Sequence, residues 1–380
     1  IIMITVKEVK SKAELRKFVD FPNKLYKDVE QFIPAMYGDD LSDWDKNENP
    51  AFEYCEGKCF LAYRGKKIVG RIGAILSHKA NETWNTNRMR FSQVDFIDDE
   101  EVSNALFKAV EDFAHEKGCN EVHGPLGFCD LDREGMLVEG FERKGMFITY
   151  YNHPYYNTHL ERLGYSKDVD WVEYLISADL PEDKAKRLDA IAMRVLAHNK
   201  LTIAILNRRK DYGPYIKQVF ELLNEAYAKL YSVVALNDRQ IERYCKKFIP
   251  LVDPDYTCFV MDENNKLAGF GVSAPSLANA MKKSNGKLFP FGAFRVLHAL
   301  KHNDTLDLFL IAVRPDLQGQ GVNAILLNHI MKNSLRNGIR FAETGPQLEY
   351  NEKVQSQWKN FQKEQHKRRR CYIKQIYKLK

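Results

Sequence analysis

A strand, a loop with two glycines and a helix follow one another near the C-terminal end of the chain. Leu306–Val313 is an almost unbroken apolar run, which is typical of a strand buried on both faces of a sheet. Pro315 ends this run, because proline cannot continue a central ladder. Gly319 and Gly321 follow, and residues 324–335 have the pattern of a helix. The succession predicts an α/β unit in which the loop joins the sheet to the helix.

A loop of this kind can bind an anion. The two glycines leave backbone N–H groups uncovered, and the helix N-terminus adds the positive end of its dipole. A pyrophosphate group is the ligand that this arrangement fits best. The dinucleotide fingerprint G-x-G-x-x-G is absent, and no Lys-Ser or Lys-Thr pair follows the glycines as a P-loop requires.

The residues that form the loop read Gln-Gly-Gln-Gly-Val-Asn. They resemble the acyl-CoA loop of the GNAT superfamily of N-acyltransferases, Q/R-x-x-G-x-G/A, except that Asn323 stands where a small residue is usual. The resemblance implies a mixed α/β fold with a centrally splayed sheet, and acetyl-CoA or a longer acyl-CoA as donor. The main chain of Ile311, Ala312 and Val313 would pair with the pantetheine arm. The pyrophosphate would be held by Gln318, Gly319, Gln320, Gly321, Val322 and Asn323.

The predicted elements occur in the same order twice, which indicates an internal duplication with a seam near Pro181. A predicted strand at residues 91–96 and a helix at 102–116 correspond to the strand and helix around the glycine loop. Where the second copy has its glycine loop, the first has the four acids Asp98–Glu101, which would repel a pyrophosphate. We therefore expect a tandem duplication of the GNAT fold. Residues 1–180 would be a degenerate domain without a CoA loop, and residues 181–380 the acyl-CoA-binding domain.

Composition sets further bounds. A chain of 380 residues exceeds one compact core, and its net charge of +6 does not demand a nucleic-acid partner. No apolar run approaches the ~20 residues of a membrane span, and the N-terminus lacks the pattern of a signal peptide. Seven scattered cysteines fit a reducing compartment, so a cytoplasmic location is expected. The basic run His366–Arg370 is typical of a solvated turn, with a nucleic-acid contact as the weaker interpretation.

Amine acylation by a thioester needs a base for the amine, a stabilised oxyanion and an acid for the leaving thiolate. Glu343, on the strand expected beside the CoA strand, is the candidate base; a structural ion pair with Arg340 is the alternative. Many GNAT proteins place a tyrosine acid on the last helix, where this sequence has Trp358. Tyr372, at the start of the last predicted strand, is a weaker substitute.

Two segments rich in aromatic residues stand outside the plain scaffold, around residues 124–156 and 274–298. With the tandem layout, they resemble a group of uncharacterised bacterial GNAT-like proteins of about this length. We expect a partly apolar acceptor pocket between the two domains, although well-packed structural aromatics are the alternative. The candidate lining residues are Phe128, Glu139, Phe141, Tyr151, Tyr155, Tyr156 and Phe291.

No metal site is expected. The run from Asp130 to Gly135 imitates the opening of a calcium loop, but the twelfth position is Phe141 instead of a bidentate glutamate. Cys55 and Cys59 lack a matching Cys or His pair for zinc.

Two classes of function remain open from the sequence. The first is an acyl-CoA-dependent N-acyltransferase that moves an acetyl or longer acyl group to a small-molecule or lipid-like amine. The second is a non-catalytic acyl-CoA-binding or scaffold protein that kept the loop and lost the chemistry. The sequence names neither the acceptor, nor the acyl length, nor the oligomeric state.

Overall fold

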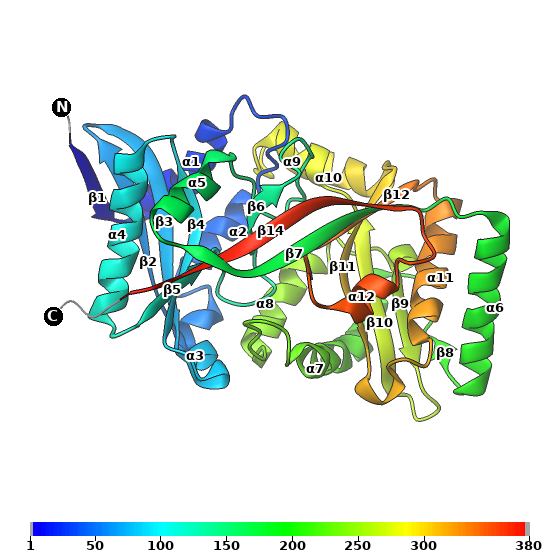
Figure 1. The fold of residues 1–380 in the computed structure, drawn as a ribbon. Helices are drawn as coiled ribbons and strands as arrows, with labels where there is room; N and C mark the ends of the chain where they lie inside the picture. The colour runs from blue at the N-terminus through cyan, green and yellow to red at the C-terminus, as the bar shows by residue number, and fades with distance from the viewer. Residues whose placement is uncertain (1–2, 377–380) are drawn as a thin grey trace. The chain divides into compact units, whose positions relative to one another are not determined.

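The computed structural model describes residues 3–376, which form two compact mixed α/β units (Figure 1). Unit 1 contains the chain up to Val172, then Leu277–Val296, then the chain from Lys367. Unit 2 contains Glu173–Ser276 and Leu297–His366. The mixed α/β class and the repeated layout are those expected from the sequence. The division at residues 180 and 181 stays a prediction, while the compact units are assembled from interleaved segments.

Unit 1 is built on a sheet with the strand order β1-β2-β3-β4-β5-β14-β7. Its strands are β1 (Ile4–Glu8), β2 (Cys55–Arg64), β3 (Lys67–Ser77), β4 (Arg88–Phe96), β5 (Glu121–Gly124), β6 (Met136–Glu139), and parts of β7 (Ser166–Ser177) and β14 (Lys363–Gln375). Its helices are α1 (Lys12–Leu25), α2 (Tyr37–Asp43), α3 (His78–Trp84), α4 (Glu100–Glu116), α5 (Tyr155–Arg162), α9 (Ala278–Ser284) and the first part of α10 (Gly292–Lys301).

Unit 2 has the sheet order β8-β9-β10-β11-β12-β7. Its strands are β8 (Thr202–Ile203), β9 (Thr257–Met261), β10 (Leu267–Pro275), β11 (Thr305–Val313), β12 (Phe341–Thr344), β13 (Gln347–Leu348) and the end of β7. Its helices are α6 (Glu182–His198), α7 (Ile216–Tyr227), α8 (Asp238–Phe248), α11 (Val322–Arg336), α12 (Glu352–Ser356) and the last part of α10.

The two sheets repeat the same order and directions. In unit 1, β2, β3 and β4 are antiparallel neighbours, and β4 then pairs with β5 in parallel after the crossover helix α4. In unit 2, β9, β10 and β11 repeat this arrangement, and β11 pairs with β12 in parallel after α11. A parallel pair needs such a crossover, and an α-helix usually supplies it. The repeated topology read from the sequence is confirmed.

The next strand of each sheet comes from the other half of the sequence. In unit 1, β5 pairs antiparallel with β14, with Gly124 opposite Tyr372 (Figure 1). In unit 2, β12 pairs antiparallel with β7, with Glu343 opposite Leu175. The C-terminal strand therefore completes the first sheet, and β7 from the first half of the chain completes the second.

The basic run at residues 366–370 corrects one expectation. It is part of β14 instead of a solvated turn, and Lys367 and Arg369 are buried in unit 1. A buried charge needs a partner. The Lys367 ammonium donates to the Lys144 carbonyl at 3.0 Å, and the Arg369 guanidinium donates to the Tyr150 carbonyl at 2.5 Å. These bonds explain why the sequence can place cations inside a sheet.

Each unit has its own apolar core on the face covered by its crossover helix. In unit 1, Leu106 and Val110 of α4 are buried with Phe91 of β4. In unit 2, Ile325 and Leu326 of α11 are buried with Leu306 of β11 and other apolar residues. Both helices bury residues at the three- and four-residue spacing of one helical face. Within residues 3–376, none of the helices is both long enough and apolar enough to cross a membrane.

Candidate active site

The strands β11 and β12 part after four paired residues. They pair in parallel from Thr305 with Phe341 to Leu308 with Thr344, where β12 ends, while β11 continues to Val313. On its other edge, the ladder of β11 with β10 shifts register at Phe309, which forms a bulge. A bulge bends and twists a strand. The structure thus has the splay that the family resemblance implies.

Backbone direction decides which residues of β11 face the splay. The Arg314 N–H donates to the Ala268 carbonyl at 2.9 Å, so the polar main-chain groups of Arg314 face β10. Because this direction alternates along a strand, Ala312 also faces β10, whereas Ile311 and Val313 face the splay. Of the three main-chain candidates, two therefore face the splay.

Side chains already contact the splay side of β11. The Tyr227 hydroxyl donates to the Ile311 carbonyl at 3.0 Å, and the Gln318 amide donates to the Val313 carbonyl at 3.2 Å. Tyr227 was not foreseen, since a tyrosine at the end of an amphipathic helix carries no signal of its own. Both contacts fix the end of β11 that leads into the glycine loop.

The glycine loop leads directly into α11. Gly319 and Gly321 have φ angles of +79° and +86°, a region that favours glycine. The first turn of α11 contains no acidic residue, and no side chain caps its N-terminus. The Gln320 amide instead donates to the Asp316 carbonyl at 2.8 Å. The positive end of the helix dipole is therefore not neutralised by a local carboxylate.

In unit 1, the N-terminus of the matching helix α4 is capped by the carboxylate of the preceding residue. One oxygen of Asp99, the residue before α4, accepts from the Glu101 N–H at 2.9 Å and from the Val102 N–H at 3.4 Å. The other oxygen binds the Arg64 guanidinium at 2.8 Å. Burial opposes ionisation, but these hydrogen bonds hold the pKa of Asp99 below its usual value. Asp99 occupies the position that an anionic ligand would need.

Two tyrosines close the splay of unit 1. The Ile97 N–H donates to the Val69 carbonyl of β3, in the same way that the Arg314 N–H donates to the Ala268 carbonyl of β10. Ile97 is therefore the counterpart of Arg314, and Phe96 is the counterpart of Val313. The Phe96 N–H donates to the Tyr156 hydroxyl at 2.8 Å, and its carbonyl accepts from the Tyr155 hydroxyl at 2.6 Å. The equivalent of the ligand-facing main chain is therefore occupied from within. Sequence reasoning assigned both tyrosines to the acceptor pocket and did not foresee this contact.

The hydroxyl of Tyr156 belongs to a buried network. It lies 2.7 Å from the Tyr26 hydroxyl, which donates to Asp95 at 2.8 Å, and Asp95 is paired with Arg71 at 2.7 Å. Burial, together with the charge of Asp95, raises the pKa of Tyr156 well above its usual value. The phenol therefore stays protonated and keeps its hydrogen bonds at physiological pH.

All seven predicted acceptor residues lie in unit 1. Phe128 is buried, with its ring 5.2 Å from that of Trp44. Glu139 is exposed and pairs with Arg368 at 3.2 Å, and Phe291 is exposed. Tyr151 and Phe141 are half-buried. Packing accounts for Phe128 without a ligand, and the acceptor role of the group stays a prediction.

Glu343 lies in a cluster of acids in unit 2 that the sequence did not reveal. Asp307 of β11 is its neighbour in the parallel register, and Glu173 lies on the same face as Leu175, the residue opposite Glu343 on β7. The His366 imidazole approaches the Glu343 carboxylate to 3.6 Å. Ligand atoms of Glu173, Glu343 and His366 all lie within 4.8 Å of one another.

This cluster is on the sheet face opposite the α11 core. Leu306, which alternates with Asp307, packs in that core, so Asp307 points to the other face. The bulged Phe309 contacts Phe248 of α8 with ring centroids 5.9 Å apart. Glu343 is one residue from the point where β11 and β12 part. A ligand in the splay would therefore meet these carboxylates at the closed end.

The structure pairs Glu343 with His366, while the Arg340 guanidinium lies over the Phe341 ring at 5.5 Å. Tyr372 belongs to unit 1, where its hydroxyl donates to Asn157 at 3.0 Å. Burial raises the pKa of Tyr372 to about 12, which keeps the phenol protonated. Its role as an acid stays a prediction.

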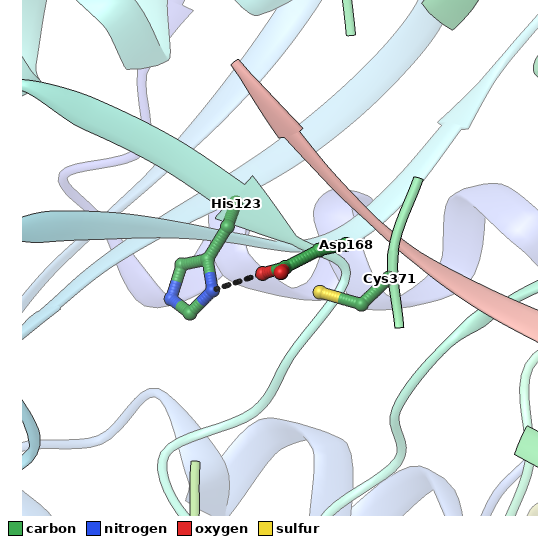
Figure 2. A group of neighbouring side chains, drawn as sticks. All are labelled: His123, Asp168 and Cys371. Atoms are coloured by element: carbon green, nitrogen blue, oxygen red, sulfur yellow. Dashed lines mark ion pairs between the residues drawn. The ribbon is translucent and has the colours of Figure 1, made fainter. Parts of the chain in front are cut away.

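A second group with metal-ligand atoms lies in unit 1. Figure 2 shows His123, Asp168 and Cys371, with the His123 Nδ1 4.0 Å from the Asp168 carboxylate. The Arg88 guanidinium is 3.5 Å from the same carboxylate. Burial, then the charges of Arg90 and Arg88, lower the pKa of His123. These cations would oppose a divalent metal, so the group is better described as a buried polar network.

Comparison with known proteins agrees with this geometry. Residues 216–356 match the acetyltransferase (GNAT) family. The chain is similar over its whole length to a solved tandem GNAT protein from the clavulanic acid biosynthesis pathway, with a TM-score of 0.59, 11% identity and 98% of each chain covered. The chain carries the tandem GNAT fold.

Two curated relatives have a higher sequence identity to this chain than the solved tandem GNAT protein has. Protein YghO of Escherichia coli (strain K12) is 27% identical, covering 96% of this chain and 94% of that protein. The bacterial ceramide synthase of Caulobacter vibrioides is 27% identical, covering 78% of this chain and 77% of that protein. The chain therefore has the GNAT fold, and GNAT proteins in general use acetyl-CoA or acyl-CoA as donor.

Replacing Tyr156 by Phe should lower the free energy of unfolding by about 1–3 kcal/mol, because the Phe96 N–H and the Tyr26 hydroxyl lose a buried partner. Urea unfolding followed by circular dichroism measures the change. Tyr350→Phe is the control, since Tyr350 is exposed. A variant of unchanged stability but altered KM for the amine would instead support the acceptor-pocket role.

Gly321→Val should abolish CoA binding, because a side chain there covers the backbone that must approach the pyrophosphate. Gly338→Val is the matched control, since Gly338 has a φ of +80° beside the other end of α11 and its Cβ would meet open space. Both variants carry similar backbone strain, while at Gly321 the Cβ would also lie 2.9 Å from the Val195 Cγ2. Titration calorimetry with CoA decides it: equal loss in both variants, or two sites in the wild type, would contradict the assignment.

Proposed function

We propose that the protein is an acyl-CoA-dependent N-acyltransferase whose donor binds to unit 2. The observation that carries the proposal is the contrast between the units. The splay and the helix N-terminus of unit 1 are filled by Tyr155, Tyr156 and Asp99, whereas α11 has no carboxylate cap. The loop of Gly319 and Gly321 would hold the pyrophosphate. The main-chain N–H groups of Ile311 and Val313, whose carbonyls already accept from Tyr227 and Gln318, would pair with the pantetheine arm.

The acidic cluster contains the carboxylate that would act as the base in catalysis. An amine acceptor arrives as an ammonium ion and must lose a proton before its nitrogen attacks the thioester carbonyl. Glu343 is the proposed base, with Glu173 and Asp307 favouring the approach of the cation and His366 beside it to pass the proton on. The new C–N bond forms as the C–S bond breaks, and the thiolate takes up a proton. Main-chain N–H groups at the splay would stabilise the oxyanion.

The same cluster weighs against a purely binding role. Buried carboxylates near a donor that is itself anionic would reduce affinity unless they serve a cation. The alternative remains testable, because it predicts CoA binding without thiol release.

For the acceptor, we propose a long-chain amine, with a fatty acyl-CoA as donor. One curated relative is named a ceramide synthase, and a ceramide is the amide of a long-chain amino alcohol and a fatty acid.

Glu343→Gln should lower kcat by about 10²–10⁴-fold, the usual contribution of a general base, with CoA affinity unchanged. The loss should shrink as the pH rises and more of the amine is already neutral. Glu364→Gln is the control, an exposed carboxylate two residues before His366. Thiol release is followed with a chromogenic disulfide. An activity that survives the substitution at all pH values would remove Glu343 from the mechanism, and a parallel assay with a chelator tests metal dependence of the cluster.

Thiol release should be faster with palmitoyl-CoA and a sphingoid amine than with acetyl-CoA and a polar amine. Mass spectrometry of the product should show one new amide bond. Binding of both donors without thiol release from any amine would favour the non-catalytic alternative. Faster acetylation of polar amines would keep the enzyme class and overturn the lipid acceptor.

A further inference from the structure

A short segment between α9 and the end of α10 exposes five large apolar side chains. We call it the 288–297 apolar patch, and its members are Leu288, Phe289, Phe291, Phe294 and Leu297. Phe289 is 88% exposed and Phe294 is 71% exposed. Single exposed apolar residues are common, but five within ten positions mark an interaction surface.

The base of this patch is fixed to unit 1. The Tyr37 N–H donates to the Gly286 carbonyl at 2.9 Å, and the Asn23 amide donates to the Asn285 carbonyl at 3.3 Å. Gly286 has a φ of +73°, and a Cβ there would lie 2.1 Å from the Ala35 carbonyl oxygen. No larger residue fits this contact. The phenylalanines are therefore presented from a packed support.

Helix α10 is apolar on two faces. Val296 and Leu300 are buried, while Phe294 and Leu297 on the adjoining face are exposed. The Arg295 guanidinium ties the first turn to the end of α9 through the Lys283 carbonyl at 2.8 Å. The second apolar face of such a helix is covered by a partner when the protein functions, because the exposure of apolar surface to water is unfavourable.

The charge of the surrounding sequence indicates which kind of surface covers the 288–297 apolar patch. Between residues 277 and 303 the sequence has five basic residues and no acidic one, and the basic residues are Lys282, Lys283, Lys287, Arg295 and Lys301. Lys287 is partly balanced by Asp20 at 3.6 Å. A second copy on this patch would bring two such basic segments together, which is unfavourable. An anionic surface matches both the charge and the apolar side chains.

We propose that the 288–297 apolar patch binds the surface of an anionic phospholipid bilayer. The phenylalanines and leucines insert at the boundary of headgroups and acyl chains, while Lys283, Lys287, Lys301 and Arg295 contact the headgroup phosphates. Lys282 is not among them, because its ammonium donates to the Val29 carbonyl. This binding goes beyond the proposed reaction and needs neither CoA nor turnover. It is a surface association, in which α10 lies along the interface.

Co-sedimentation of the full chain with vesicles tests this proposal. The protein should sediment with vesicles of phosphatidylcholine and phosphatidylglycerol and much less with phosphatidylcholine alone, and added salt should weaken the binding because it screens charge. The double variant Phe289→Asp, Phe294→Asp should bind at least about tenfold more weakly, since its carboxylates enter the interface. Ile205→Asp is the matched control, because Ile205 is 81% exposed in unit 2.

Three outcomes would overturn the proposal. They are the absence of vesicle binding, equal binding to both vesicle types, or an equal loss in the double variant and the Ile205 control. A stable dimer in light scattering that the double variant dissociates would assign the patch to a second copy instead. Circular dichroism without vesicles shows that the double variant is folded. Because neither the vesicle assay nor this control uses CoA, failure of membrane binding leaves the proposed reaction standing, and failure of that reaction leaves the membrane proposal standing.

Discussion

The parting of two parallel strands governs both units, because it leaves main-chain polar groups without a strand partner. A buried N–H or C=O group without a hydrogen bond costs free energy comparable to the lost bond, so each splay needs something to fill it. Unit 1 uses its own Tyr155 and Tyr156 hydroxyls at Phe96. Unit 2 has side chains on two carbonyls, from Tyr227 and Gln318, and a glycine loop next to them. The same backbone geometry thus gives a closed scaffold in one unit and a candidate ligand site in the other.

The exchange of strands explains features that look unfavourable in isolation. Lys367 and Arg369 can be buried because β14 runs into unit 1, where the Lys144 and Tyr150 carbonyls accept their hydrogen bonds. Arg370 forms a bidentate pair with Asp170 at 2.8 and 3.1 Å. Such pairs fix the register of a strand through geometry, because a shift by one residue would turn every one of these cations to the other face.

The sequence predicted what depends on neighbouring residues. The apolar run, the proline stop and the glycine spacing gave β11, the loop and α11, and the acids at residues 98–101 predicted that the first copy lacks a phosphate site. Contacts between distant segments were missed. Glu173, Asp307 and His366 come from three strands far apart in the chain, and only the register brings them to Glu343. Asp307 did carry a signal, as a single acid inside an apolar strand, and a buried carboxylate of that kind is a candidate for function.

Charge is distributed along β11 in a way that suits an extended donor. One end leads to the glycine loop and the uncapped N-terminus of α11, where the field favours a pyrophosphate. The other end holds Asp307 beside Glu343, where an anion is disfavoured and an ammonium ion is favoured. The six residue steps from Asp307 to Val313 span about 20 Å at the usual rise of a strand, enough for an extended arm between the two ends. A donor bound the wrong way round would place its phosphates beside carboxylates. In the complex that we propose, the strand would therefore select the orientation that brings the thioester to the acids and the amine.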